Sequence, residues 1–240
     1  MRLDKILANM GYGTRKEVKG YLRDSYVTVD GKIVKDCGQN VDERKQTIIF
    51  NGETVVYKEF VYLMMNKPAG VLSATEDSRG VKTAIDILPL EYSHYNVGPA
   101  GRLDIDTEGF LLLTNDGVFV HNIISPNKHV DKVYYAKVDG ELDNDDVEAF
   151  ADELVLGDEY KCMPAKLEII SSGPVSEALV TLHEGKFHQV KRMFLARQKE
   201  VIFLKRISIG GVKLDEKLAI GDTRELTQSE VEVLNNNGDE

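Results

Sequence analysis

The amino-acid sequence predicts an α+β fold, with a small N-terminal module over residues 1–58 and a larger domain with a mixed, largely antiparallel sheet over residues 60–240. The first part combines two short helical patterns with a hairpin signal, and the rest is rich in strand-like runs interrupted by few helical ones. The chain of 240 residues is long enough for one small and one medium domain. Its 42% apolar and 29% charged residues are typical of a soluble, folded protein.

The N-terminal module is expected to begin with two helices and a hairpin. Apolar residues at helical spacing over residues 3–10 predict the first helix, and the glycines after it are expected to end it. Thr14 and Glu17 form a capping-box pattern that begins the second helix. Asp30–Gly31, between two β-rich runs, is a strong hairpin signal, and further strands are expected to close the module near Tyr57.

From residue 60 onward, several runs read as strands or as strands followed by turns. These runs are FVYLMMNKPAGVLS, GFLLLTND, KVYYAKVDG, AKLEIIS, EALVTLHEG and VIFLKRISIGG. Helices are expected between or after them, where apolar residues follow helical spacing or a capping box occurs. The markers are Val147, Phe150 and Leu154 for one helix, Phe187, Val190 and Phe194 for another, and Thr227 with Glu230 for the last. Many strands and few helices favour an antiparallel sheet over a doubly wound one.

Several classes of protein are excluded by composition. No segment approaches the roughly 18 apolar residues needed to span a bilayer, and the first residues lack the apolar run and cleavage site of a secretion signal. Cys37 and Cys162 are far apart in sequence, which suggests neither a disulfide framework nor a cysteine-based zinc site. We therefore expect a cytoplasmic protein with two reduced thiols and no membrane contact.

The net charge of −10 at first argues against a nucleic-acid partner, but its distribution reverses that conclusion. Residues 139–159 contain ten carboxylates and no Lys or Arg, which equals the excess of the whole chain. Residues 1–23 have a balance of +4, and residues 183–206 a balance of +5. Because an RNA backbone responds to the potential within roughly 8–10 Å, these two basic segments are candidates for RNA contact. The acidic run is expected to be a solvated helix face.

The densest candidate site is the segment Gly98–Gly117, in which polar residues and glycines immediately precede an apolar strand. A carboxylate at the mouth of a buried strand lies in a low dielectric, which makes its charge reactive. Asp104 and Asp106 both fit this description. A calcium loop is excluded, because its bidentate Glu position falls on Asn115. An Asp-rich turn that only caps the strand is the alternative interpretation.

A second candidate site is the segment His183–Phe194. Its two histidines are five residues apart with a glycine between them, so the spacing of a zinc protease is not met. The segment also carries Lys186, Lys191 and Arg192, which suit contact with phosphate or pairing with a buried acid. A solvated basic helix is the alternative.

Two shorter segments are also candidates for substrate contact. In Asn66–Thr75, a buried-looking strand meets a proline and a glycine, which marks a tight loop that either contacts substrate or is only structural. Farther along, Tyr134 and Tyr135 are adjacent in a strand and therefore point to opposite faces. One of the two can stack on a base while the other enters the core.

Together, these segments resemble the ribosomal small-subunit pseudouridine synthase A family. GRLDIDTEGFLLLTNDG resembles its signature motif around the nucleophile, NKPAGV its first motif, KVYYAKV its tyrosine motif and EGKFHQVKRMF its last motif. The N-terminal module resembles the alpha-L RNA-binding domain. The resemblance covers nearly the whole chain, with the motifs in the expected order.

The resemblance implies roles for the site residues. Asp104 is the implied nucleophile, a choice that charge arguments alone leave open between Asp104 and Asp106. Tyr134 is implied to stack on the target uracil and to assist proton removal at its C5 atom. Lys191 is implied to pair with the nucleophile and keep it ionised, with Arg192 as the alternative partner.

Other contacts follow from the same resemblance and from charge. Val190 is expected to supply apolar packing beneath the base, and Arg102 to fill the space that the extruded base leaves. Contacts with the RNA backbone are expected from basic side chains near the N-terminus and in the first motif. These are Lys5, Arg15, Lys16, Lys19 and Lys67.

The implied activity is conversion of one uridine in the 16S rRNA of the small ribosomal subunit to pseudouridine. The reaction needs neither a metal nor a cofactor, because it includes no redox step and no added group. The expected substrate is ribosomal RNA within a small-subunit assembly intermediate, and the expected enzyme is a monomer. Two alternatives stay open: a uridine in 23S rRNA, because sister families share the motifs, and a non-catalytic RNA-binding ribosome-assembly factor.

Overall fold

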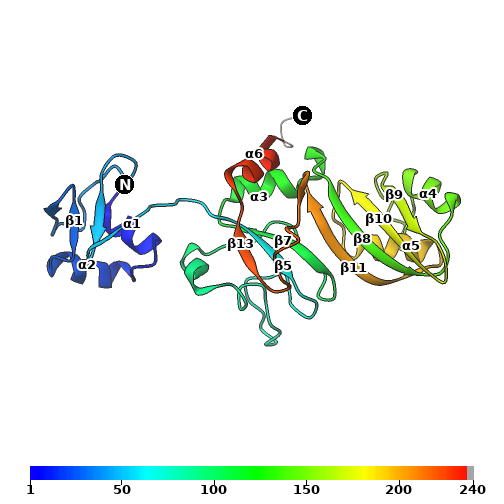
Figure 1. Ribbon diagram of the computed structural model, residues 1–240, viewed down its shortest axis with the longest axis horizontal. Coiled ribbons are helices and arrows are strands. Elements are labelled where there is room, and N and C mark those ends of the chain that lie inside the picture. The colour runs from blue at the N-terminus through cyan, green and yellow to red at the C-terminus, as the bar shows by residue number, and fades with distance from the viewer. Residues whose placement is uncertain (237–240) are drawn as a thin grey trace. The chain divides into compact units, whose positions relative to one another are not determined.

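The computed structural model describes residues 1–236, and the chain divides into two compact units (Figure 1). The first comprises Met1–Val61 together with Pro89–Asn96, and the second comprises Tyr62–Leu88 and the chain from Val97 onward. The exact module boundary expected from the sequence stays a prediction. In the described part of the chain, no helix is long and apolar enough to cross a bilayer.

The first unit contains two helices and a small sheet with the strand order β2-β1-β3-β4, joined by one apolar core. Its elements are α1 (Leu3–Asn9), α2 (Arg15–Arg23), β1 (Val27–Val29), β2 (Lys32–Ile33), β3 (Ile48–Phe50), β4 (Glu53–Thr54) and the 3-10 helix η1 (Leu90–Tyr95). The predicted capping box begins α2: the Thr14 hydroxyl accepts from the Glu17 amide at 3.3 Å, and the Glu17 carboxylate accepts from the Thr14 amide at 2.7 Å. The predicted hairpin turn joins β1 and β2, with positive φ angles of 50° at Asp30 and 75° at Gly31.

The second unit is built on a nine-stranded sheet. Most of its strands follow the order β13-β5-β7-β11-β8-β10-β9, and the other two, β12 and β6, pair with β11 and β7. The strands are β5 (Tyr62–Lys67), β6 (Gly98–Pro99), β7 (Glu108–Thr114), β8 (Lys132–Asp139), β9 (Lys166–Ser171), β10 (Val175–Leu182), β11 (Glu200–Ile209), β12 (Val212–Lys213) and β13 (Thr223–Glu225). These strands pair antiparallel, except that β7 and β11 are parallel. The predicted α+β fold is confirmed, and each predicted strand run contains a strand.

The parallel contact between β7 and β11 depends on a glycine. Gly109 lies opposite Arg206 with a φ of +98°, and a Cβ atom there would collide with the Arg206 backbone. Any side chain at this position would push the two strands apart. The contact places the loop that enters β7 next to the strand that carries Arg206.

One face of the sheet is covered by two helices that lie side by side in Figure 1, α3 (Gly117–Ile124) and α6 (Gln228–Asn236). Phe119 of α3 and Leu234 of α6 share an apolar cluster with Phe110 and Leu112 of β7. The predicted capping box begins α6, but α3 was not expected from the sequence. Its N-cap is Asp116, whose carboxylate accepts from the amides of Val118 and Phe119 at 3.0 Å each.

The remaining helices are α4 (Asn144–Ala151) and α5 (Gln189–Ala196), which pack through the rings of Phe150 and Phe194 with centroids 4.9 Å apart. A further 3-10 helix, η2, spans Pro126–Lys128. Both predicted helices exist, but the apolar pattern overestimated their lengths. Phe187 precedes α5 and is 71% exposed, because His188 adopts a left-handed conformation with φ of 50° and the helix begins only after it.

The acidic segment does not form a purely solvated face. Asp146 is buried, and its two oxygens bind Arg197 at 2.8 Å and Lys199 at 3.2 Å. Burial raises the pKa of Asp146, but the hydrogen bonds from both cations outweigh it and hold the pKa below its usual range. The ion pair between Asp146 and Arg197 thus anchors α4 to the end of α5. The charge count alone did not indicate this role.

Candidate active site

Asp104 lies on the loop Gly101–Thr107, which leads into β7. Hydrogen bonds from other segments fix this loop: the Ser73 hydroxyl donates to the Leu103 carbonyl at 2.9 Å and accepts from its amide at 3.0 Å. The amide of Gly70 binds a carbonyl of the same loop at 2.7 Å. The Asp104 side chain is 23% exposed. The loop therefore presents one partly buried carboxylate.

The carboxylate lies in a cleft that gathers residues from the Asp104 loop, from β8 and from the beginning of α5. The predicted site residues that line it are Arg102, Asp104, Tyr134 and Val190. Within residues 1–236, no three His, Cys, Asp or Glu side chains are grouped as a metal site requires. The cleft combines one acid, Asp104, with the rings of Tyr134 and His188, the cations of Arg102 and Lys186, and apolar side chains.

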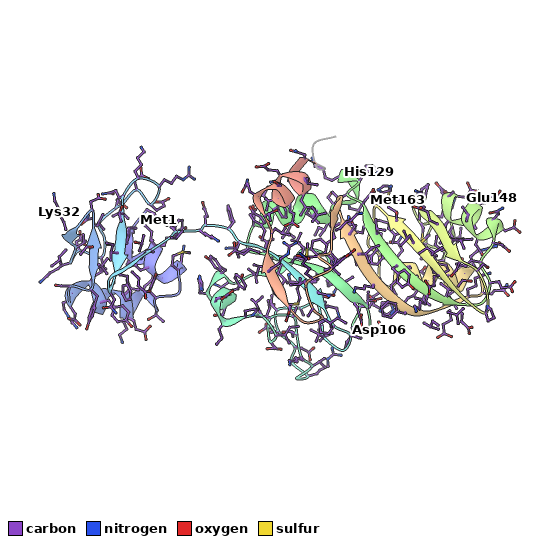
Figure 2. All side chains as sticks on the ribbon, in the orientation of Figure 1. Met1, Lys32, Asp106, His129, Glu148 and Met163 are labelled. Atoms are coloured by element: carbon purple, nitrogen blue, oxygen red, sulfur yellow. The ribbon has the colours of Figure 1, made fainter. Side chains whose placement is uncertain are left out.

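Lys191 of α5 lies between the two carboxylates that charge arguments could not separate. Its Nζ atom is 3.4 Å from Asp104 Oδ2 and 2.5 Å from Asp106 Oδ1. The hydrogen bond from Lys191 holds the pKa of Asp106 below its usual range. The Asp106 side chain, labelled in Figure 2 on the loop that enters β7, is 66% exposed and does not line the cleft. Asp104 is therefore the inner carboxylate, and Asp106 is an outer partner of the same lysine.

Tyr134 and Tyr135 point to opposite faces of β8. Tyr134 is 8% exposed and lines the cleft. Tyr135 lies on the other face, where its ring centroid is 6.1 Å from that of Phe203. Of the two tyrosines, Tyr134 is the one that a base in the cleft can reach.

Arg206, which was not expected at the site, lies beside Tyr134. It is 2% exposed, and its Nε atom donates to the Phe110 carbonyl at 2.7 Å. Its other nitrogens donate to the Gly101 carbonyl at 3.3 Å and approach the Tyr134 hydroxyl at 3.5 Å. Because a guanidinium only donates, the phenol oxygen accepts from it and directs its own proton elsewhere. Arg206 thus connects β7, the Asp104 loop and the tyrosine.

The beginning of α5 carries two more residues of the cleft. Val190 is 4% exposed, and His188 places its Nε2 atom 3.6 Å from Asp104 Oδ1. A buried pair supports this turn: Gln189 Nε2 donates to Glu184 Oε1 at 2.6 Å. The beginning of α5, which carries Lys191, is therefore fixed by the Glu184 carboxylate, which has no cationic partner among the described residues.

Lys67 is a structural residue and not an exposed cation. It is fully buried, and its Nζ atom donates to the carbonyls of Pro68 at 2.9 Å, Val71 at 2.7 Å and Ile105 at 3.3 Å. Burial lowers its pKa to about 8. A phosphate cannot reach this side chain, so the expected contact with RNA is replaced by a role in holding two loops together.

Arg192 does not approach Asp104 either. It forms an ion pair with Asp158 and donates to the Phe187 carbonyl at 3.3 Å. The alternative in which Arg192 pairs with the nucleophile therefore has no support from the geometry. Arg102, in contrast, is exposed at the rim of the cleft, where a side chain can enter the space left by a base.

The basic residues expected to bind RNA in the first unit are all exposed. Arg15 pairs with the buried Asp4 at 3.2 Å, which offsets its charge. Lys5, Lys16 and Lys19 form no ion pair with any residue that the structure describes. The first unit thus presents several uncompensated lysines to solvent.

The site residues that sequence reasoning missed are Arg206, Glu184 and His188. Arg206 follows Leu204 at the two-residue period of a strand, so a basic residue on the buried face of β11 was the available signal. Glu184 and His188 lie in the segment that was predicted as a candidate site for its basic residues. Nothing in their spacing indicated a buried carboxylate or an imidazole facing Asp104.

Comparison with known protein families agrees with both units. The family described as RNA pseudouridylate synthase matches residues 61–196, and the S4 domain family matches residues 1–46. A solved structure described as a pseudouridylate synthase is 36% identical, covers 98% of this chain and 99% of its own, and has a TM-score of 0.68.

Curated relatives match over the whole chain. A Bacillus subtilis protein described as an uncharacterized RNA pseudouridine synthase is 49% identical over 98% of each chain. Ribosomal small subunit pseudouridine synthase A of Vibrio cholerae is 38% identical over 96% of this chain and 98% of its own, and ribosomal large subunit pseudouridine synthase B of Bacillus subtilis is 38% identical over 97% and 95%. The chain belongs to the RNA pseudouridine synthase family and carries an S4 domain at its N-terminus.

Proposed function

We propose that this enzyme converts one uridine in the 16S rRNA of the small ribosomal subunit to pseudouridine, with Asp104 as the nucleophile. The observation that carries the assignment of Asp104 is its position in the cleft with Tyr134, with a single lysine at 3.4 Å. A carboxylate held next to a cation at the wall of a cleft keeps its orientation toward a bound base.

The reaction breaks the bond between C1′ of the ribose and N1 of the uracil, turns the base, and forms a bond between C1′ and C5. The proton on C5 leaves and one is gained at N1, so no atom is added or lost overall. The carboxylate of Asp104 can act on the ribose, on the base or as a proton acceptor, and each role needs its ionised form. Lys191 places a positive charge 3.4 Å from that carboxylate.

The target base has to leave its stack to enter the cleft, which costs a few kcal/mol. Stacking on Tyr134 is expected to return about 1–3 kcal/mol. Val190 and Leu204 provide apolar walls for the base, and Arg102 at the rim is placed to occupy the gap in the RNA. Arg206 keeps the tyrosine ring in position.

The choice of the small subunit rests on the sequence motifs, and relatives with this name match the whole chain at 36–38% identity. The second candidate is a uridine in 23S rRNA, favoured by the large-subunit relative at 38% identity. We further propose that the enzyme acts in the cytoplasm as a monomer on a small-subunit assembly intermediate. The S4 domain would hold the RNA through its exposed lysines.

The test is to map pseudouridine in both ribosomal RNAs from a strain that lacks the gene, complemented with the wild type or with Asp104→Asn. We expect a single 16S position to lose its pseudouridine in the deletion strain and in the variant, and to regain it with the wild type. Loss of a 23S position with 16S rRNA unchanged would overturn the small-subunit assignment. Full modification by Asp104→Asn would remove the proposed nucleophile.

A further inference from the structure

The turn before α5 carries a stacked aromatic pair whose outer ring, Phe187, has no role in the proposed reaction. The rings of Phe187 and His188 are stacked, with centroids 3.8 Å apart and planes at 18°. Phe187 is 71% exposed. Single exposed apolar residues are common on protein surfaces, so exposure alone indicates nothing. A ligand is indicated by the cleft and the cations next to this ring.

The pair is continuous with the catalytic cleft. His188 lines the cleft and faces Asp104 across 3.6 Å, and Lys186 on the same turn lines it as well. Phe187 stacks on the imidazole and so extends the aromatic surface from the cleft toward solvent. The Phe187 ring is therefore adjacent to the cleft that would hold the target base.

The pair is also held rigidly. The Gln189 side chain accepts from the Lys186 amide at 2.9 Å and donates to the buried Glu184 at 2.6 Å. Arg192 donates to the Phe187 carbonyl at 3.3 Å. A surface that is ordered before binding loses little conformational entropy when a ligand arrives. These bonds fix the backbone from which the ring projects, and the ring itself stacks on His188.

Charge next to the ring selects the kind of ligand. Lys186 and Arg102 are exposed at the same cleft, whereas Arg192 and Lys191 are paired with acids. Exposed cations beside an aromatic ring are typical of surfaces that bind single-stranded nucleic acid, where the phosphates meet the cations and the bases stack. A protein partner would require a larger apolar patch than one ring.

We infer that Phe187, backed by His188, is a stacking platform for the base of a nucleotide adjacent to the target uridine. This inference rests on the proposed function and deepens it: the RNA is bound with at least two neighbouring bases unstacked, one in the cleft against Tyr134 and one outside it on Phe187. The platform reads the π-face of the base, so it tolerates different bases at that position.

The sequence contains no tryptophan, which allows a direct test. Phe187→Trp introduces a single fluorescent ring at the platform, and Ile170→Trp introduces a matched one on the edge strand β9, where Ile170 is 55% exposed. Unmodified 16S and 23S rRNA transcripts are titrated against each full-length variant. We expect the transcript that binds to quench the fluorescence of Phe187→Trp strongly and to leave that of Ile170→Trp nearly unchanged.

A second pair of variants measures the contribution of the ring. Phe187→Leu should lower kcat/KM on the same transcript about tenfold, because leucine cannot stack on a base. Phe187→Tyr should stay within about twofold, because tyrosine keeps the aromatic face. Thermal unfolding of both variants should match the wild type, because the ring is exposed.

The outcomes separate this inference from the proposed function. Wild-type conversion of uridine with no quenching in Phe187→Trp, or with equal kcat/KM for Phe187→Leu and the wild type, overturns the platform and leaves the proposed reaction standing. Failure of the wild type to form pseudouridine in either ribosomal RNA overturns the proposed function, whatever the fluorescence does. Equal quenching in both tryptophan variants also overturns the platform, because the signal is then not specific to this turn.

Discussion

Two cations beside Tyr134 and Asp104, Arg206 and Lys191, are arranged in the opposite way to the lysines of the S4 domain. Lys191 is held between two carboxylates, and Arg206 is held by backbone carbonyls and a phenol. On the S4 domain, Lys5, Lys16 and Lys19 are exposed and form no ion pair within residues 1–236.

The difference matches two physical tasks. A cation with fixed partners sets the position of a neighbouring group. This effect acts over a few ångströms and is little affected by salt. A free surface lysine attracts a polyanion from a distance and is screened by salt. The following predictions test whether the two regions divide the work in this way.

The largest effect is expected within the cleft, from the two neighbouring carboxylates. Asp104→Asn should lower kcat by at least about 10³-fold, the scale seen when a nucleophile is removed, with RNA affinity changed only a few-fold. Asp106→Asn should lower kcat less than about tenfold, because the residue is an outer partner of Lys191 and does not line the cleft. Single-turnover assays with mass spectrometry measure both rates. Equal losses in the two variants would contradict the assignment of the inner carboxylate.

The next effect concerns Lys191, the lysine that pairs with Asp104 and Asp106. Lys191→Met should lower kcat by roughly 10²-fold, comparable to the loss of one charged group that stabilises a reacting centre. Arg192→Met is the matched control on the same helix, because Arg192 pairs with Asp158 and not with Asp104. A larger loss in the control than in Lys191→Met would mean that the ion pairs of the structure do not describe the working enzyme.

A smaller effect is expected from the S4 domain. Replacing Lys5, Lys16 and Lys19 together with Gln should weaken RNA binding about tenfold at low salt and flatten the slope of log K against log salt by up to about 2, while single-turnover kcat on bound RNA stays near the wild type. Arg15→Gln should change the slope less per charge removed, because Asp4 already compensates that residue. Fluorescence anisotropy at several salt concentrations gives both slopes, and an unchanged slope in the triple variant would remove the S4 domain as the RNA anchor.

The smallest effect concerns stability and follows from the buried Lys67. Burial lowers its pKa to about 8, below the usual 10.5, so the unfolded chain binds more protons than the folded one between these pH values. The free energy of unfolding of the wild type should therefore rise as the pH increases from about 8 to about 10.5, and Lys67→Met should lack this part of the rise. Thermal unfolding of both proteins across this pH range measures it, and parallel profiles would contradict a buried, destabilised charge.

Short-range signals made much of the fold predictable. The capping boxes at Thr14 and Thr227 and the turn at Asp30–Gly31 depend on neighbouring residues only, and all three are confirmed. Helix α3 was missed because Asp116 precedes an apolar run that reads equally well as the end of a strand and a turn. The sequence cannot decide whether such an acid caps a helix or ends a strand.

The site was predictable to a different extent. The motifs identified Asp104, Tyr134, Val190 and Lys191 as candidates, and the structure brings them together. Their roles stay predictions. For Arg206 the sequence indicated only a basic residue on the buried face of a strand, because its partners come from distant strands and depend on the sheet order. Lys67 failed as a surface cation for a related reason, since burial depth is a property of the whole fold.

The place of β11 in the sheet has a consequence for how the enzyme is made. This strand lies between β7 and β8, although it follows both in the chain, and Gly109 allows it to meet β7 closely. Contacts between segments so far apart in sequence form late and slowly. While the polypeptide is being synthesised, β7 and β8 therefore cannot be joined through β11 until Arg206 has left the ribosomal exit tunnel.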